Sequence, residues 1–237
     1  MYSEWKNMNK TNIEEIKTLA LIFLNSEINE TGVSFVASHP FTNSWFTMLR
    51  SMEMVDLHIE ENANKWRSEF KEIILDSDLL HLFMLLNKAY ILNFLKFAEK
   101  YISDDDLGMI IGAFWQSIEQ ISLDTSMSSK DIIKLFKRAN KAKLMDEEEY
   151  EKFNSLDDEI TLYRGVTSHN KGRKKAMSWT TDKDIAKWFA NRFSTNTGEI
   201  WEIKIPKERV LCVFDGRESE YIVDLYGFEK KFVVEKC

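Results

Sequence analysis

The sequence predicts an α+β protein in which an α-helical region precedes a small β-rich domain. Apolar residues recur at helical spacing through residues 1–155, and β-like segments follow from about residue 157. Apolar side chains make up 44% of the 237 residues, with only 2 Pro and 8 Gly. The chain therefore has enough apolar residues for a core and little linker. We expect two domains, residues 1–155 and residues 156–237.

The first expected helix begins near Thr11. Glu14 follows three residues later, which is the pattern of a capping box, and apolar residues then recur at Ile16, Leu19, Ala20 and Phe23. Residues 31–50 interrupt the helical pattern. His39-Pro40 predicts a loop or turn there, because the residue before a proline avoids the helical conformation.

Two further helices are expected over residues 60–75 and 78–101. The second carries more apolar residues than one surface helix needs, which predicts a central buried helix. These apolar residues are Leu79, Leu82, Phe83, Leu86, Tyr90, Phe94 and Phe97. We expect Leu82, Phe83, Leu86, Tyr90 and Phe94 to form a core within the N-terminal region.

Capping residues mark two more helix starts. One of the pair Asp104-Asp105 can cap a helix that runs through Ile121. Ser128, with Asp131 three residues later, predicts a helix that ends near Lys143. These helices complete the expected N-terminal region.

The C-terminal part reads as strands with one helix among them. β-branched and aromatic residues cluster in short segments, which is typical of strands. The expected strands are Ile160–Tyr163, Trp201–Ile205, Val210–Phe214, Tyr221–Val223 and residues 229–236, and the expected helix is Asp182–Phe193.

Charge is divided unevenly along the chain. Residues 159–237 hold 15 basic and 12 acidic residues, whereas the preceding residues hold 17 and 27. Such an acidic first part does not suit a nucleic-acid clamp. It is more typical of a solvated helical surface, and a basic partner is the alternative.

Few residues are available for disulfides or metal binding. Two cysteines, Cys212 and Cys237, are too few for a disulfide scaffold or a zinc site, and the four histidines show no ligand spacing. The chain also has no apolar run long enough to span a bilayer and no secretory signal at its N-terminus. We expect a cytoplasmic protein without a metal and without a membrane partner.

The segment Tyr163-Arg164-Gly165 lies at the end of an expected strand. An arginine there can present its planar guanidinium to a phosphate, and the following glycine lets the backbone stay close. A surface arginine beside a turn is the alternative interpretation.

A second segment, Ser178-Trp179-Thr180, precedes the expected helix. If it is a strand, its two hydroxyl groups face the same side. The alternative is a strand-to-helix turn whose hydroxyls serve only for capping.

The third segment, Glu218-Ser219-Glu220, carries two carboxylates two residues apart at the start of an expected strand. On one side of a strand, such like charges repel each other, which favours a functional reason for their presence. The alternative is a solvated edge strand whose acids discourage aggregation.

Taken together and in this order, the three segments resemble the Arg-Ser-Glu class of mono-ADP-ribosyltransferases. The resemblance covers about residues 157–237 and departs from the family at Thr180, where a second serine is common; the hydroxyl is kept. It favours this class over the related class that uses His, Tyr and Glu, because no histidine stands at the position of Arg164. The whole chain also resembles phage- and prophage-borne proteins of low-GC bacteria, which suggests a phage or toxin-like effector.

The resemblance implies that the protein uses NAD⁺ as a co-substrate. It assigns NAD⁺ binding to Tyr163, Arg164, Gly165, Ser178, Trp179 and Thr180. Glu220 would stabilise the oxocarbenium ion that forms as nicotinamide leaves, and Glu218 would act on the acceptor. We expect a macromolecular acceptor. A host-protein side chain such as arginine is favoured over a nucleic acid. The alternatives are an NAD⁺ glycohydrolase, in which water is the acceptor, and a catalytically silent binding protein.

Overall fold

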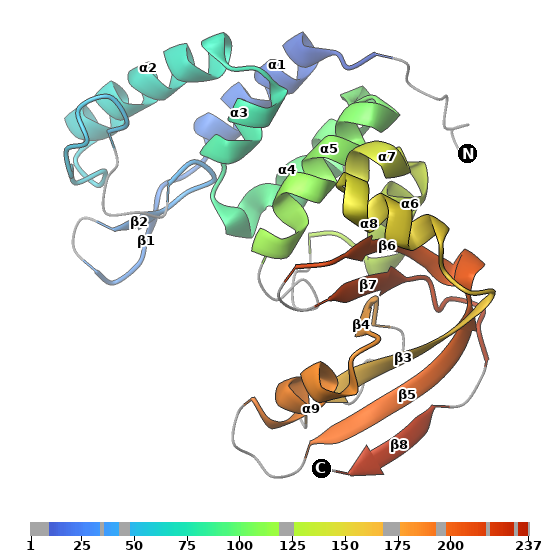
Figure 1. The fold of residues 1–237 in the computed structure, drawn as a ribbon. Coiled ribbons are helices and arrows are strands. Elements are labelled where there is room, and N and C mark those ends of the chain that lie inside the picture. Colours follow the sequence, from blue (N-terminus) through green and yellow to red (C-terminus); the bar gives the residue numbers. More distant parts are fainter. Residues whose placement is uncertain are drawn as a thin grey trace. The chain divides into compact units, whose positions relative to one another are not determined.

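The computed structural model describes residues 10–33, 36–42, 48–118, 126–167, 176–192, 198–216, 219–229 and 232–236. Contacts within the chain divide it into two compact units, Met1–Met127 and Ser128–Cys237. The described part contains both helices and strands, as expected for the α+β class (Figure 1). The first unit is mainly helical, and the second combines helices with a sheet.

The division after Met127 differs from the expected one after residue 155. Three helices, α6 (Ser129–Arg138), α7 (Lys141–Leu144) and α8 (Glu147–Asn154), belong to the second unit. The helices α6 and α8 pack against strand β6 (Val210–Phe214), and the Met145 Sδ atom accepts a hydrogen bond from the Val213 N–H at 3.4 Å. Sequence periodicity distinguishes helix from strand, but it does not show which helix packs on which sheet.

The first unit contains short strands β1 and β2, five α-helices and three 3₁₀ turns in its described part. These elements are β1 (Asn29–Glu30), β2 (Ala37–Ser38), α1 (Ile13–Leu24), α2 (Glu60–Asp76), α3 (Leu79–Leu85), η1 (Lys88–Tyr90), α4 (Ile91–Ala98), η2 (Glu99–Tyr101), α5 (Asp104–Phe114) and η3 (Trp115–Ser117). Its core holds fully buried side chains that include Ile16, Trp66, Leu82, Phe83 and Phe94. Leu79, Leu82, Phe83, Leu86 and Phe94 of the apolar set expected here are buried, whereas Tyr90 is half-buried and Phe97 is 47% exposed.

The prediction of a single helix over residues 78–101 is wrong. The chain leaves helical geometry after Leu85 and resumes it at Lys88. Asn87 explains the break: its N–H donates to the Pro40 carbonyl at 2.8 Å, and its side-chain amide donates to the carbonyls of His39 and Thr42. These contacts to a distant segment replace the hydrogen bonds that a continuous helix would make.

Two of the expected caps are shifted by a residue or more. Asn12 caps α1, while the Thr11 hydroxyl donates to the Asp106 carboxylate and accepts from the Ser103 N–H at 2.8 Å. Ser103, not one of the following aspartates, caps α5. Ser128 caps α6 as expected. The Thr11 hydroxyl, which the sequence pattern assigned to the cap of α1, thus binds residues at the start of α5 instead.

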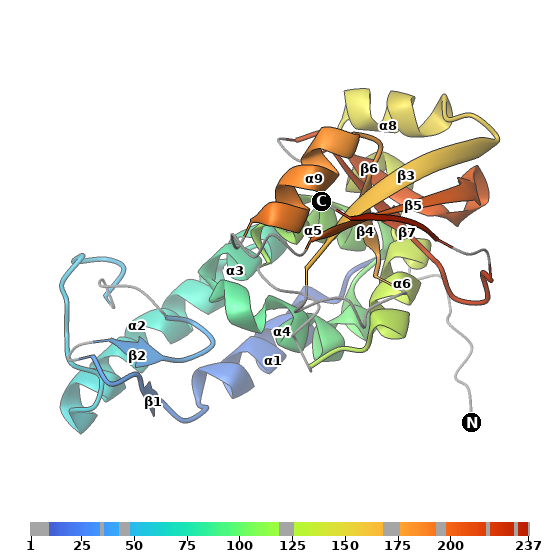
Figure 2. The same ribbon diagram turned by 90° about the horizontal axis from the view of Figure 1, so that it is seen from below.

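The described residues of the second unit form a six-stranded sheet in the order β6-β7-β4-β3-β5-β8. All neighbouring strands are antiparallel. Besides β6, the strands are β3 (Glu159–Val166), β4 (Ser178–Thr180), β5 (Glu199–Pro206), β7 (Glu220–Val223) and β8 (Val233–Lys236), and a 3₁₀ turn, η4 (Lys207–Arg209), links β5 to β6. Helix α9 (Lys183–Asn191) follows β4 and packs on β3, β4 and β5 (Figure 2).

Glycine allows α9 to approach the sheet closely. A Cβ atom on Gly165 of β3 would lie 2.1 Å from the Ala186 carbonyl oxygen and 2.5 Å from the Ala190 nitrogen. A Cβ atom on Gly198 would lie 2.3 Å from the Ala190 carbonyl oxygen. Both glycines are therefore required by the packing of the helix backbone against β3 and β5.

Candidate functional site

The three motif segments lie on three neighbouring strands. Arg164 is on β3, Ser178 and Thr180 are on β4, and Glu220 is the first residue of β7. The order β7-β4-β3 in the sheet places β4 between the other two. Segments separated by up to about sixty residues in the sequence are therefore side by side in the structure.

Thr180 is the central residue of this arrangement. It pairs with Tyr163 on one side and with Glu220 on the other. Residues directly opposite in antiparallel strands project from the same face of a sheet. Tyr163, Thr180 and Glu220 therefore form a row across one face, and Ser178, two residues before Thr180, belongs to that face as well. Glu202 of β5 continues the row, because it pairs with Tyr163.

Arg164 starts from the opposite face of the sheet. It follows Tyr163 in the strand and pairs with Trp201 of β5, and side chains alternate between faces along a strand. Its guanidinium nevertheless reaches back to the neighbouring strand, where Nη1 donates to the Ser178 carbonyl at 2.5 Å. The cationic group of Arg164 is thus held at the beginning of β4, beside a residue of the Glu220 face.

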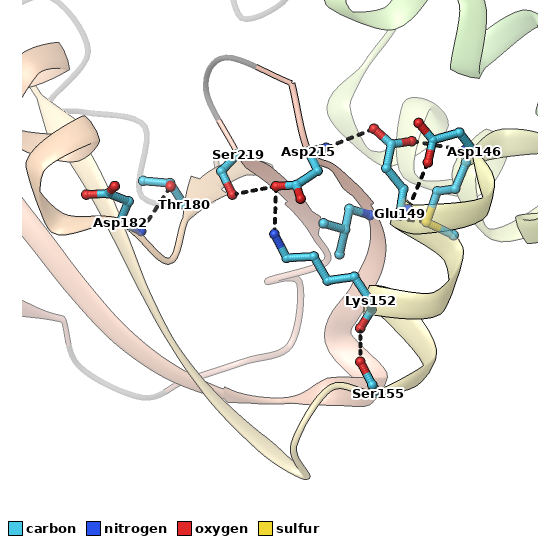
Figure 3. Close-up of polar contacts among 10 residues, drawn as sticks. Asp146, Glu149, Lys152, Ser155, Thr180, Asp182, Asp215 and Ser219 are labelled. Carbon is cyan, nitrogen blue, oxygen red and sulfur yellow. Dashed lines mark hydrogen bonds and ion pairs between the residues drawn. The ribbon is translucent and has the colours of Figure 1, made fainter.

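Burial differs among the predicted binding residues. Tyr163, Arg164, Ser178 and Glu220 are half-buried, whereas Thr180 is buried. The Thr180 hydroxyl oxygen accepts a hydrogen bond from the Asp182 N–H at 3.1 Å, just before α9 (Figure 3). Thr180 therefore takes part in the strand-to-helix turn, as the capping interpretation of this segment expected.

Trp179 lies in the core. It is 2% exposed, its indole N–H donates to the Ala176 carbonyl at 2.8 Å, and its ring stacks on Phe232 with 5.7 Å between centroids. Trp201 stacks on the same Phe232 ring at 5.0 Å. These aromatic side chains fill one face of the sheet around Arg164.

Glu220 follows the turn that connects β6 to β7, of which the structure describes Asp215, Gly216 and Ser219. The Ser219 N–H donates to the Gly216 carbonyl at 3.1 Å, and Ser219 has a φ of 41°, in the left-handed region. Few non-glycine residues adopt this conformation, and those that do are held by their surroundings. Glu218, the predicted acceptor-activating acid, lies outside the described residues.

Residues from α8 and both ends of this turn form a polar cluster (Figure 3). The Lys152 Nζ donates to the Asp215 Oδ1 at 2.7 Å, and the Ser219 hydroxyl donates to the same oxygen at 3.3 Å. The Glu149 Oε1 accepts from the Asp215 N–H at 2.8 Å. We call Lys152, Asp215, Ser219 and Glu149 the turn clamp.

The ion pair in the turn clamp changes the pKa of both partners. The hydrogen bond from Lys152 lowers the pKa of Asp215. Burial lowers the pKa of Lys152, but the hydrogen bond to Asp215 and the nearby Tyr221 phenol raise it, and the net result is a raised pKa. Lys152 Nζ lies 5.7 Å from the centre of the Tyr221 ring. Both groups are therefore charged at neutral pH.

The sequence does not reveal the turn clamp. Asp215 precedes the predicted acidic motif by only a few residues, but Glu149 and Lys152 lie more than sixty residues earlier, in a region assigned to the other domain. The one local signal is the capping box of α8, in which Asp146 and Glu149 cap each other. That pattern predicts the start of a helix and does not indicate a contact with β6.

No family model, no curated protein and no solved structure matches the chain. Among the described residues there is no cluster of His, Cys, Asp and Glu side chains that could hold a metal ion. Within the same residues, no helix is both long and apolar enough to cross a membrane.

Proposed function

We propose that the protein is a mono-ADP-ribosyltransferase that takes ADP-ribose from NAD⁺ and transfers it to a macromolecular acceptor. The observation that carries the proposal is the pairing of Thr180 with both Tyr163 and Glu220. It brings the arginine, hydroxyl and carboxylate segments onto three neighbouring strands, in the combination that the motif resemblance requires.

The chemistry of the proposed reaction needs a carboxylate where positive charge develops. The bond between nicotinamide and C1′ of the ribose breaks, its electron pair leaves with nicotinamide, and C1′ becomes an oxocarbenium centre. A carboxylate beside that centre stabilises it electrostatically, as in glycoside hydrolysis. Glu220 is the acid that we assign to this role, because it is half-buried at the start of β7 and lies in the row with Thr180 and Tyr163.

The pyrophosphate of NAD⁺ requires a cationic group. Arg164 fits this requirement, since its guanidinium is held at the beginning of β4 by the Ser178 carbonyl. A guanidinium makes charge-assisted, bidentate bonds to phosphate oxygens. Ser178 belongs to the face of Glu220, and we assign its hydroxyl to the nicotinamide-ribose end of the site.

The acceptor completes the reaction. Its nucleophile bonds to C1′ and loses its proton to a base, a role that we assign to Glu218. A protein side chain such as arginine is the acceptor that we favour. An NAD⁺ glycohydrolase differs only in using water as the acceptor, and a silent binding protein would hold NAD⁺ without cleaving it. One assay separates these outcomes.

The test is incubation of the protein with NAD⁺ labelled on the adenine moiety in a cell lysate. Nicotinamide release and labelled macromolecules are measured side by side. Release together with labelled protein is expected. Release without any labelled macromolecule would show a glycohydrolase, and neither signal at millimolar NAD⁺ would contradict the proposed enzyme activity.

A further inference from the structure

The geometry points to Lys152 of α8 as a positioning residue for Glu220, which acts by holding the turn between β6 and β7 through Asp215 and Ser219. This inference rests on the proposed function for the role of Glu220. The holding contacts themselves can be measured without NAD⁺.

One carboxylate joins the two ends of the turn. Asp215 directly follows β6, and Ser219 directly precedes Glu220 and β7. The Asp215 Oδ1 accepts from Lys152 Nζ at 2.7 Å and from the Ser219 hydroxyl at 3.3 Å. A single oxygen atom thus links both ends of the turn to a helix that lies outside it (Figure 3).

A second contact from the same helix fixes the backbone. Glu149, one turn before Lys152 on α8, accepts the Asp215 N–H at 2.8 Å. The other Glu149 oxygen accepts the Asp146 N–H at 3.1 Å in the capping box. The start of the turn is therefore tied to α8 by both its main chain and its side chain.

The position of Ser219 makes this restraint important. Its left-handed φ of 41° is an uncommon conformation for a serine, and such conformations persist when neighbouring contacts hold them. The direction in which Glu220 leaves the turn depends on that angle, because the two residues are adjacent. Releasing Asp215 from Lys152 weakens the restraint on Ser219, because Lys152 anchors the carboxylate that Ser219 binds, and it changes no residue assigned to NAD⁺.

The test compares Lys152→Met, Lys152→Arg and the control Lys207→Met in the full chain. Lys207 Nζ forms an ion pair of similar length, 2.9 Å, with Asp158. This pair lies at the start of β3, at the end of the strand away from Arg164. Methionine keeps most of the length of lysine and removes the charge. Arginine keeps the charge and can donate to Asp215.

The first readout is amide hydrogen exchange of Asp215 and Ser219 in the protein without NAD⁺. Both N–H groups are hydrogen-bonded in the turn clamp or the turn. We expect exchange to be roughly two- to fivefold faster in Lys152→Met, the size typical of a partly exposed ion pair. Lys152→Arg should restore slow exchange, and Lys207→Met should leave it unchanged. Unaltered exchange in Lys152→Met would overturn the inference.

The second readout is nicotinamide release. We expect Lys152→Met to lower kcat by roughly three- to tenfold and to leave KM nearly unchanged, because a catalytic group is misplaced while the binding residues stay. Lys152→Arg should recover kcat. Faster exchange with a wild-type kcat would refute the positioning role. A wild-type protein that releases no nicotinamide would instead contradict the proposed function. The exchange data would then still test whether Lys152 holds the turn.

Discussion

At the scale of single residues, Arg164 shows how far a strand motif can be interpreted. Its segment and the Ser178 segment are on neighbouring strands. Side-chain alternation nevertheless starts Arg164 on the face opposite to Glu220. The contact from its guanidinium to the Ser178 carbonyl depends on side-chain length and on strand register, and neither the motif nor its spacing contains that information.

The geometry of this contact leads to a prediction on NAD⁺ binding. Arg164→Lys should weaken NAD⁺ binding by about tenfold although the charge is kept, because lysine lacks the planar fork that pairs with phosphate oxygens. Calorimetric titration with NAD⁺ measures the effect. The matched control is Arg192→Lys, at the C-terminal end of α9, which should bind like the wild type. Equal affinity in Arg164→Lys would remove Arg164 from the site.

Local patterns at single residues predicted where elements begin better than they predicted contacts between distant residues. Ser128 caps α6 as its sequence predicts. Thr11 has an equally good capping pattern, yet its hydroxyl bonds to Ser103 and Asp106 of another segment, and Asn12 takes the cap. A pattern of neighbouring residues is thus overruled where a distant residue offers a stronger partner.

At the scale of elements, local patterns located most of the expected strands and also the helices α2 and α9, but not the helix expected over residues 78–101. Four of the five expected strands, those of β3, β5, β6 and β7, were located to within a residue or a few, because β-branched and aromatic residues mark them. The prediction of one helix over residues 78–101 was wrong, because Asn87 bonds to a segment some fifty residues away and the helix is interrupted there. Apolar spacing alone does not reveal such an interruption.

The close packing of α9 on β3 gives a prediction on stability. Gly165→Ala should lower the free energy of unfolding by about 3 kcal/mol, because the added Cβ would lie 2.1 Å from the Ala186 carbonyl oxygen. Denaturant unfolding measures the change. Gly227→Ala is the comparison: its site is open, and its φ of +71° alone should cost about 1 kcal/mol. Equal losses in the two variants would show that α9 does not pack as described.

At the scale of the whole molecule, the grouping of helices was the feature that sequence could not provide. Composition changes near residue 157, but α6 and α8 pack on β6. All five residues of β6 are buried. The Lys137 ammonium also donates to Asp224 after β7, at 2.6 Å. The second unit therefore needs residues that the change in composition assigns to the first.

This grouping predicts how fragments behave. Residues 128–237 should fold alone, with a cooperative thermal transition and resistance to limited proteolysis. Residues 156–237 should not, because removing α6 and α8 leaves the apolar residues of β6 without their cover. Circular dichroism during heating distinguishes the two fragments. A cooperative transition in the shorter fragment would contradict the division after Met127.

The central claim is that Glu220 meets the positive charge that forms when nicotinamide leaves NAD⁺. The most direct measurement is the rate of nicotinamide release by Glu220→Gln compared with Glu202→Gln. Glu202 is a matched control, because it is also half-buried and lies in the same cross-strand row, beyond Tyr163. Loss of the carboxylate should slow release by roughly 100- to 1,000-fold in Glu220→Gln, whereas Glu202→Gln should act like the wild type. Full release by Glu220→Gln, or an equal loss in both variants, would contradict the assignment.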